Sequence, residues 1–283
     1  MALVFYNFNG SIVPAEQQVL RLNNRSFHYG DGLFESMRMI RGNLQFAGLH
    51  AKRLQMGMKA LKFDNYALLD SVFLVEKAKE LSSRNKSKSG RLRLTVFRDS
   101  DGLYTPDDQK FGYSLEWETL EDQQYTLNTK GLIMNVYEEM QKPVNMLSNL
   151  KTCNSLTYVL AGIFKQKHRL NDAFILNQNG FLCESISSNI FIKYNNILYT
   201  PALSEGCIRG VMRQVVIDLA LKNNIQVIEA QINPQILNEA EEVFLTNATR
   251  GIQWVLGFNR KRYFYEYSRL LSNKLNEQLS DSV

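Results

Sequence analysis

The stretch FLCESISSNIFIKYNNILYTPALSEGCIRGVMRQVV, residues 181–216, joins short apolar runs to the start of an amphipathic helix. Asn and Gly, which favour turns, separate the apolar runs, and this pattern predicts a series of short strands. From Val211 the apolar residues recur at helical spacing, and Gly206 and Gly210 bracket the start of that helix. The stretch therefore predicts strands followed by a helix, with Glu184 at the end of the first strand.

Strands and helices mix along the rest of the chain without regular alternation. The Asn-Gly pair at 9–10 predicts a hairpin with a type I′ turn over residues 3–13. Because the loops are too short for parallel crossovers, we expect mainly antiparallel pairing and an α+β fold. The other expected elements are a hairpin at 33–47, helices at 48–61, 66–81 and 210–223, and strands at 91–97, 111–120, 131–139, 173–176, 181–184, 189–201, 225–230 and 241–249.

A polar segment divides the chain. Residues 119–131, TLEDQQYTLNTKG, show no apolar periodicity and predict a domain junction. We expect a small N-terminal α+β domain at 1–122, an interdomain loop at 123–131 and a larger C-terminal domain at 132–283.

Composition narrows the function classes. The chain has 283 residues and a net charge of +5 that is spread without a long basic block, so we expect neither a nucleic-acid nor a membrane partner. The first residues, MALVFYNFNGSIVP, lack the features of a signal peptide. Three widely spaced cysteines without a C-x-x-C pair favour packed thiols in a reducing cytoplasm and argue against a metal site.

Lys151 lies directly ahead of an apolar helix in LKTCNSLTYVLAG, residues 150–162. The apolar residues of this helix have the spacing of a core-facing stripe: Leu156, Val159, Leu160, Ile163 and Phe164. Two interpretations of the lysine are open: a surface residue that precedes a helix, or an amine held in a dry pocket for its chemistry.

The second interpretation can be checked against what a lysine-bound aldehyde cofactor requires. Pyridoxal phosphate needs an amine, a carboxylate near its ring nitrogen and backbone N–H groups for its phosphate. Glu184 is the candidate carboxylate, and the N–H groups of Val211 and Met212 after Gly210 are candidate phosphate donors. The loop LTNAT at 245–249 is a second phosphate candidate. Taken singly, each of these features is more typical of an ordinary strand end or turn.

Together the features resemble the signature of the class IV aminotransferases, which are fold-type IV pyridoxal-phosphate enzymes. RSFHYGDGLFESMR at 25–38, LHAKRL at 49–54 and LKTCNSL at 150–156 are similar to further motifs of the family. The signature positions are Glu184, Ile186, Asn189, Ile190, Phe191, Leu198, Thr200, Ile208, Gly210, Val211 and Arg213.

This resemblance implies the following roles. Lys151 is similar to the lysine that binds the cofactor and moves the substrate proton, and Glu184 to the partner of the pyridine nitrogen. Ile208 resembles the residue packed on the cofactor ring. The full implied cofactor set is Arg53, Lys151, Glu184, Asn189, Ile208, Gly210, Val211, Met212, Asn247 and Ala248. The family also implies a D-amino-acid aminotransferase-like fold, a cofactor in the interdomain cleft and a homodimer with a shared active site.

Several of these residues have a simpler interpretation. Arg53 taken alone is a solvated helix cation, and Asp31 is a turn residue. Tyr29 and Phe34, with His28, either line a substrate pocket or belong to the core. Arg93 and Arg98 either bind a substrate carboxylate or are exposed strand cations.

The family contains lyases and transaminases. Branched-chain enzymes have a tyrosine five residues after the lysine, whereas this chain has Leu156 there. GVMRQ at 210–214 and FLTNAT at 244–249 also resemble the lyases, while HYG at 28–30 resembles the branched-chain type. We expect a 4-amino-4-deoxychorismate lyase that forms p-aminobenzoate and pyruvate for folate synthesis. The alternatives are a branched-chain or D-amino-acid transaminase acting on a small amino substrate and, less favoured, a non-catalytic scaffold.

Overall fold

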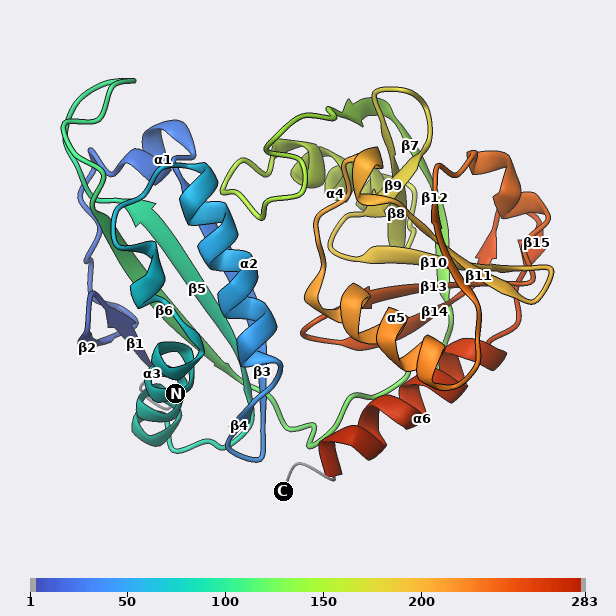
Figure 1. Cartoon of the computed structure of the whole chain (residues 1–283), viewed down its shortest axis with the longest axis horizontal. Helices are drawn as coiled ribbons and strands as arrows, with labels where there is room; N and C mark the ends of the chain where they lie inside the picture. Colours follow the sequence, from blue (N-terminus) through green and yellow to red (C-terminus); the bar gives the residue numbers. More distant parts are fainter. Residues whose placement is uncertain (1–3, 281–283) are drawn as a thin grey trace. The chain divides into compact units, whose positions relative to one another are not determined.

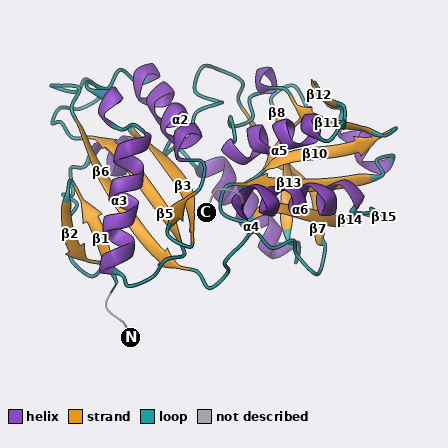
Figure 2. Ribbon diagram, turned by 60° about the horizontal axis from the view of Figure 1, so that its bottom comes forward, coloured by secondary structure: helices purple, strands orange, loops and turns teal. Residues whose placement is uncertain are grey.

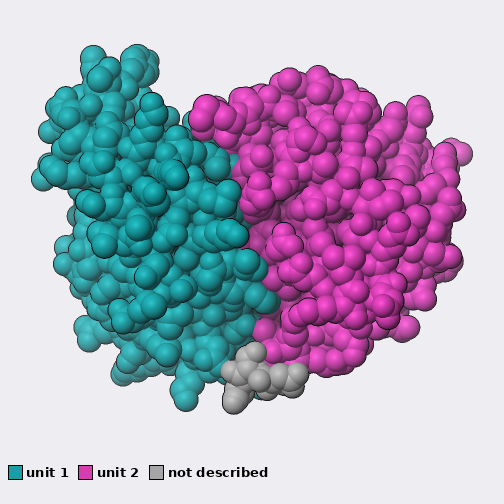
Figure 3. All heavy atoms as spheres, viewed as in Figure 1, with its two compact units in different colours: residues 1–123, 150–154 teal, residues 124–149, 155–283 magenta. Residues whose placement is uncertain are grey.

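The computed structural model describes residues 4–280, and the chain divides into two compact units. The first unit holds the described residues up to Gln123 together with Leu150–Asn154. The second unit holds Gln124–Asn149 and the chain from Ser155 onward (Figure 3). The short segment around Lys151 thus belongs to the first unit, although residues on either side of it belong to the second.

The first unit is an antiparallel sheet with strand order β2-β1-β6-β5-β3-β4. Helices α2 and α3 pack on the sheet (Figures 1 and 2). The strands are β1 Phe5–Phe8, β2 Ser11–Pro14, β3 Gly32–Ile40, β4 Asn43–Leu44, β5 Gly90–Arg98 and β6 Phe111–Thr119, and the helices are α1 Arg25–Tyr29, α2 Ala47–Ala60, a 3-10 turn Tyr66–Leu68 and α3 Ser71–Arg84.

Local sequence explains where these elements begin and turn. Asn9 and Gly10 both have positive φ, at 47° and 92°, as the predicted type I′ hairpin requires. The helix expected at 66–81 is divided, because the Asp70 side chain accepts a 2.8 Å hydrogen bond from the Phe73 N–H and so caps α3.

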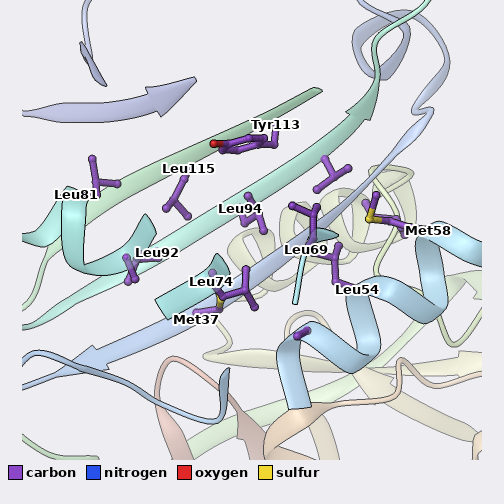
Figure 4. Packing of buried hydrophobic residues seen from close by; sticks show 14 of the residues in the cluster. Met37, Leu54, Met58, Leu69, Leu74, Leu81, Leu92, Leu94, Tyr113 and Leu115 are labelled. Carbon is purple, nitrogen blue, oxygen red and sulfur yellow. The ribbon is translucent and has the colours of Figure 1, made fainter. Parts of the chain in front are cut away.

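The core of the first unit follows the alternation of β5. Leu92 and Leu94 are fully buried, whereas Arg91 and Arg93 on the other face are half-buried, as the period of two along a strand requires. The buried leucines pack with apolar residues of α2 and α3 (Figure 4). The other face of the strand is thereby left for polar and functional side chains.

The second unit is a mixed sheet with strand order β12-β11-β10-β13-β14-β7-β8-β9, and β15 pairs with β14. Its strands are β7 Leu132–Lys142, β8 Asp172–Asn177, β9 Leu182–Ser185, β10 Asn189–Tyr194, β11 Ile197–Pro201, β12 Val227–Ala230, β13 Glu242–Asn247, β14 Gly251–Phe258 and β15 Lys261–Arg262. Its helices are α4 Leu156–Lys167, α5 Val211–Lys222 and α6 Glu266–Ser280, with 3-10 turns at Leu203–Glu205 and Pro234–Asn238.

The expectation of mainly antiparallel pairing is wrong for part of this sheet. β7 is parallel to β8 and to β14, and β11 is parallel to β12. The connection from β7 to β8 contains α4, and the connection from β11 to β12 contains α5. A helix supplies the length that a parallel crossover needs, so loop length alone was a poor guide.

Helix α4 forms where the periodicity predicted it, but the stripe that was expected to face the core is wrong. Leu156 is 74% exposed, and Val159, Leu160 and Ile163 are exposed as well. The helix packs instead through Tyr158, Ala161 and Phe164. Because α4 is apolar on two faces, the spacing of its leucines does not reveal which face meets the sheet. Among residues 4–280, no helix combines the length and the apolar run needed to cross a bilayer.

Candidate active site

The main chain around Lys151 is bound to the start of β3. The Phe34 N–H donates to the Lys151 carbonyl at 2.9 Å, and the Cys153 N–H donates to the Gly32 carbonyl at 2.9 Å. Leu33 and Thr152 form an antiparallel bridge between these bonds. Residues 151–153 therefore continue the sheet of the first unit beyond β3, and the position of Lys151 is fixed by backbone geometry.

The side chain of Lys151 lies against an aromatic ring. Its Nζ is 4.2 Å from the ring centroid of Phe34, and the guanidinium carbon of Arg93 is 3.9 Å from the same centroid. Both cations make cation–π contacts with Phe34. The structure thus places an amine and a guanidinium at one ring, an arrangement that suits a substrate with a carboxylate near its amino group.

A buried carboxylate on β3 organises α2. Glu35 accepts hydrogen bonds from the Arg53 guanidinium at both of its oxygens, and the Nε bond is 2.8 Å long. His50 Nδ1 lies 2.6 Å from Glu35 Oε2 and donates to it, which leaves the buried Nε2 of His50 without a partner. Arg53 is buried, so its interpretation as a solvated cation is wrong. The network fixes the guanidinium of Arg53.

The protonation states of this network follow from its burial and charges. Burial alone would raise the pKa of Glu35, but the charge of Arg53 and the hydrogen bond from His50 outweigh it and lower the pKa to about 2. Burial also lowers the pKa of His50, against the opposing pull of Glu35. At neutral pH the three side chains are therefore a carboxylate, a neutral imidazole and a guanidinium.

In the second unit, Glu184 on β9 is buried and accepts three hydrogen bonds. The Ile208 N–H donates to Oε2 at 2.9 Å, and the Tyr158 hydroxyl donates to Oε1 at 2.7 Å. Lys142 Nζ, at the end of β7, donates to Oε1 and forms an ion pair. The sequence pointed to Glu184 but not to Lys142 or Tyr158, because neither lies near it in the chain.

Neutral groups surround this ion pair. Burial, followed by the charge of Glu184 and the hydrogen bond to it, raises the pKa of Tyr158, so its hydroxyl stays a donor. Burial likewise raises the pKa of the Cys183 thiol and raises that of Cys207 to about 12. These two cysteines are fully packed, as the sequence predicted, and they stay neutral.

Helix α5 begins in the same region without a side-chain cap. Gly210 is its N-cap, no side chain accepts from its first turn, and Val211 and Met212 are buried. Asn189 donates to the Ile208 carbonyl at 2.8 Å, and its side-chain oxygen would lie 1.9 Å from a Cβ at Gly210. Open N–H groups at a helix N-terminus favour an anion, and the position of Asn189 explains why residue 210 is a glycine.

The loop after β13 is fixed by its own asparagine. Asn247 donates to Ser188 Oγ at 2.9 Å and accepts from the N–H groups of Thr249 and Arg250. The Tyr125 hydroxyl donates to the carbonyl of Ala248 at 3.0 Å. The side chain of Asn247 therefore shapes this loop. A phosphate contact from Ala248 stays a prediction.

Two of the candidate substrate residues have different surroundings. Arg98 is 5% exposed and donates to Asp31 at 2.9 Å, to Gln109 and to the Leu61 carbonyl, so its interpretation as an exposed cation is wrong and its contacts indicate a structural role. Asp31 also accepts from Arg25, beyond the turn role expected for it. Tyr29 is half-buried and its ring lies 5.3 Å from that of Tyr104. A substrate contact from Tyr29 is still a prediction.

These residues form two groups. Lys151, Phe34, Arg93 and Arg53 belong to the first unit, and Glu184 with the start of α5 belongs to the second. A family model described as amino-transferase class IV matches residues 32–257. The chain belongs to the class IV aminotransferases. The matched range includes Lys151 and Glu184, the amine and the carboxylate that the sequence motifs indicated.

Individual class IV relatives agree with this assignment. A provisionally named branched-chain-amino-acid aminotransferase of Methanocaldococcus jannaschii is 27% identical over 274 residues, which cover 96% of this chain and 94% of that protein. A D-alanine aminotransferase of Bacillus licheniformis is 26% identical over 256 residues, or 87% of this chain and 85% of that protein.

Solved structures confirm the expected fold type. The crystal structure of a provisionally named 4-amino-4-deoxychorismate lyase from Legionella pneumophila matches with a TM-score of 0.80 at 23% identity, covering 95% of this chain and 97% of that chain. The resemblance to class IV aminotransferases that the motifs indicated is thus confirmed for the family and for the fold. A cofactor position between the domains stays a prediction.

Proposed function

We propose that this class IV aminotransferase family member uses pyridoxal 5′-phosphate and acts in the cytoplasm as a 4-amino-4-deoxychorismate lyase. One observation favours the lyase over a branched-chain transaminase. The fifth residue after Lys151 is Leu156, which is 74% exposed, and the nearby tyrosine of α4, Tyr158, donates its hydroxyl to Glu184. The phenol that branched-chain enzymes carry at the fifth position therefore has no counterpart there.

The residues present fit the cofactor. When bound, pyridoxal phosphate supplies an electrophilic aldehyde and a ring that accepts an electron pair. Lys151 Nζ would hold the aldehyde carbon, and the buried Glu184 would hold a proton at the ring nitrogen. The open N–H groups of Val211 and Met212 would bind the phosphate, where Gly210 leaves room for close approach. Arg53 is the cation that we assign to the same phosphate.

In the proposed reaction, Lys151 takes the proton from the substrate carbon that bears the amino group. The bond to the enolpyruvyl oxygen then breaks, the six-membered ring becomes aromatic, and p-aminobenzoate and pyruvate leave. The atoms of the substrate equal those of the two products, so no co-substrate is needed. Arg93, which shares the ring of Phe34 with Lys151, is placed to bind a substrate carboxylate.

Transamination is the second candidate, and the names of the relatives favour it. The Methanocaldococcus and Bacillus proteins carry the names of branched-chain and D-alanine aminotransferases. In that reaction Lys151 would move the same proton to a second carbon, and a 2-oxo acid would leave. Both reactions need the same amine and the same carboxylate.

The deciding experiment uses protein loaded with pyridoxal phosphate. The protein is incubated with 4-amino-4-deoxychorismate and, separately, with L- and D-amino acids plus 2-oxoglutarate or pyruvate. We expect p-aminobenzoate and pyruvate in equal amounts, with slow amino-group exchange. Rapid formation of 2-oxo acids without p-aminobenzoate would establish the transaminase, and the preferred donor would identify it.

Gly210→Ala tests the phosphate site. Because a Cβ at this position would lie 1.9 Å from Asn189 Oδ1, the substitution must displace either the Asn189 side chain, which is bonded to the Ile208 carbonyl, or the start of α5. We expect cofactor affinity to fall by about tenfold or more, which corresponds to about 1.4 kcal/mol. Gly162→Ala is the matched control, because a Cβ there meets nothing within 4 Å. Equilibrium titration of the two apo-proteins with the cofactor measures both affinities, and an unchanged affinity in Gly210→Ala would remove α5 from the phosphate site.

We also propose a homodimer that buries the exposed stripe of α4, defined as Leu156, Val159, Leu160 and Ile163. Exposed apolar side chains gathered on one helix face favour association. Ile163→Glu should convert the dimer to a monomer, as measured by the molar mass from size-exclusion chromatography with light-scattering detection. Leu221→Glu on α5, at a residue that is 55% exposed, should leave the dimer intact. A monomeric wild-type protein would contradict this proposal.

A further inference from the structure

Lys142 is a buried lysine that the proposed reaction does not use. It is the last residue of β7, is 7% exposed, and its Nζ donates to Glu184 and to the Ser148 carbonyl at 3.1 Å. The same ammonium lies 5.5 Å from the ring centroid of Tyr158. A buried ammonium is costly unless it is paired, and the ion pair with Glu184 offsets that cost.

The charge balance around Glu184 depends on Lys142. The charge of Glu184 acts on Tyr158, Cys183 and Cys207, and all three stay neutral because their pKa values are raised. Among the described residues, Lys142 is thus the cation that forms a hydrogen-bonded ion pair with Glu184. With it, the buried pair carries no net charge. Without it, Glu184 would present a full negative charge.

A carboxylate that is already paired with a cation stabilises a second cation less. We propose that Lys142 is a positioning residue that offsets the charge of Glu184 and so keeps the ring nitrogen of the bound cofactor less protonated than an unpaired glutamate would. This inference rests on the proposed function in one respect, namely that Glu184 faces the ring nitrogen. It holds for either candidate reaction.

The consequence concerns the choice between reactions. A less protonated ring withdraws electrons less strongly and supports amino-group transfer less well. Elimination from 4-amino-4-deoxychorismate is driven in part by the formation of an aromatic ring. It therefore requires less electron withdrawal by the cofactor ring. Lys142 would therefore favour elimination over amino-group transfer.

The test uses the holoenzyme with cofactor labelled with ¹⁵N in the ring. The ¹⁵N chemical shift is measured at one pH for the wild type, for Lys142→Met and for Lys142→Gln, and the charge-preserving Lys142→Arg serves as the rescue variant. We expect the two neutral variants to move toward the shift of a pyridinium ion and the arginine variant to stay near the wild type. In the neutral variants the ratio of amino-group transfer to elimination should rise by about tenfold, the factor that one pKa unit represents.

Lys193→Met is the matched control. Lys193 is also 7% exposed and paired with carboxylates, Glu266 at 2.8 Å and Glu241 at 3.4 Å, in the same unit. Its loss should leave the ¹⁵N shift unchanged, which separates a local charge effect from general destabilisation. If Lys142→Met does not fold, Lys142→Gln provides the same neutral test while it keeps a donor toward Glu184.

The outcomes separate this inference from the proposed function. A wild-type protein that does not bind pyridoxal phosphate at Lys151 refutes the proposed function and this inference with it. A wild type that binds the cofactor, together with neutral Lys142 variants whose ¹⁵N shift is unchanged, refutes the inference alone. An equal change in Lys193→Met would also overturn it.

Discussion

Lys151→Ala should abolish turnover of every substrate, with a loss of about ten-thousandfold or more. The variant loses both the amine that holds the cofactor and the base that takes the substrate proton. Its fold should persist, because the Lys151 main chain keeps its bond to Phe34 and the cation–π interaction of the lysine with the Phe34 ring is worth only about 1 kcal/mol.

Covalent attachment can be measured separately from activity. Borohydride reduction of the wild-type holoenzyme, followed by peptide mass spectrometry, should place the cofactor on Lys151. The Lys151→Ala protein should carry none, and Lys167→Ala, at an exposed lysine near the end of α4, should behave as the wild type. Normal activity in Lys151→Ala, or attachment at another lysine, would remove Lys151 from its proposed role.

Glu35→Gln should destabilise the protein by about 3–5 kcal/mol at neutral pH. The substitution leaves the buried guanidinium of Arg53 and the imidazole of His50 without the carboxylate that accepts from both. Urea unfolding followed by circular dichroism measures the change. Asp108→Asn is the control, since that carboxylate pairs with Lys110 on the exposed surface and its loss should change little.

The same network predicts acid sensitivity. The pKa of Glu35 is about 2 in the folded state against an ordinary value of 4.5, so the unfolded chain binds more protons between these values. The contribution of Glu35 to the free energy of unfolding is fully present above about pH 4.5 and is lost as the pH falls toward 2. His50, whose pKa is also lowered, acts in the same direction below its ordinary 6.5. Glu35→Gln should therefore unfold with a shallower dependence on pH between 4.5 and 2, and an unaltered slope would contradict this account.

The fold was predictable where local signals decide it. The Asn-Gly turn at 9–10 and the strand at 91–97 are specified by their own residues, and both predictions are confirmed. The face that α4 buries was not predictable, because its apolar residues occupy two sides. Helix α6 is an element that the sequence pattern did not predict, although Leu271 and Leu275 have helical spacing and are fully buried.

The residues of the candidate site were likewise predictable only in part. Lys151, Glu184 and Gly210 carry chemistry that can be recognised in short motifs. Their partners are distant in sequence: Lys142 is separated from Glu184 by 42 residues, and Glu35 from Arg53 by 18. Lys142 in the sequence is indistinguishable from a surface cation at a strand end, and only the packing of β7 beside β8, and of β8 beside β9, brings it to the carboxylate.

The backbone bonds between residues 151–153 and β3 have a thermodynamic consequence. Because the Lys151 main chain is part of this sheet, a ligand that binds its amine more tightly in the folded first unit than in the unfolded chain would stabilise the sheet by mass action. The amide groups of Phe34 and Cys153 donate these hydrogen bonds. Their exchange with solvent would slow as the amine becomes occupied, so two backbone amides report on the chemistry of a side chain.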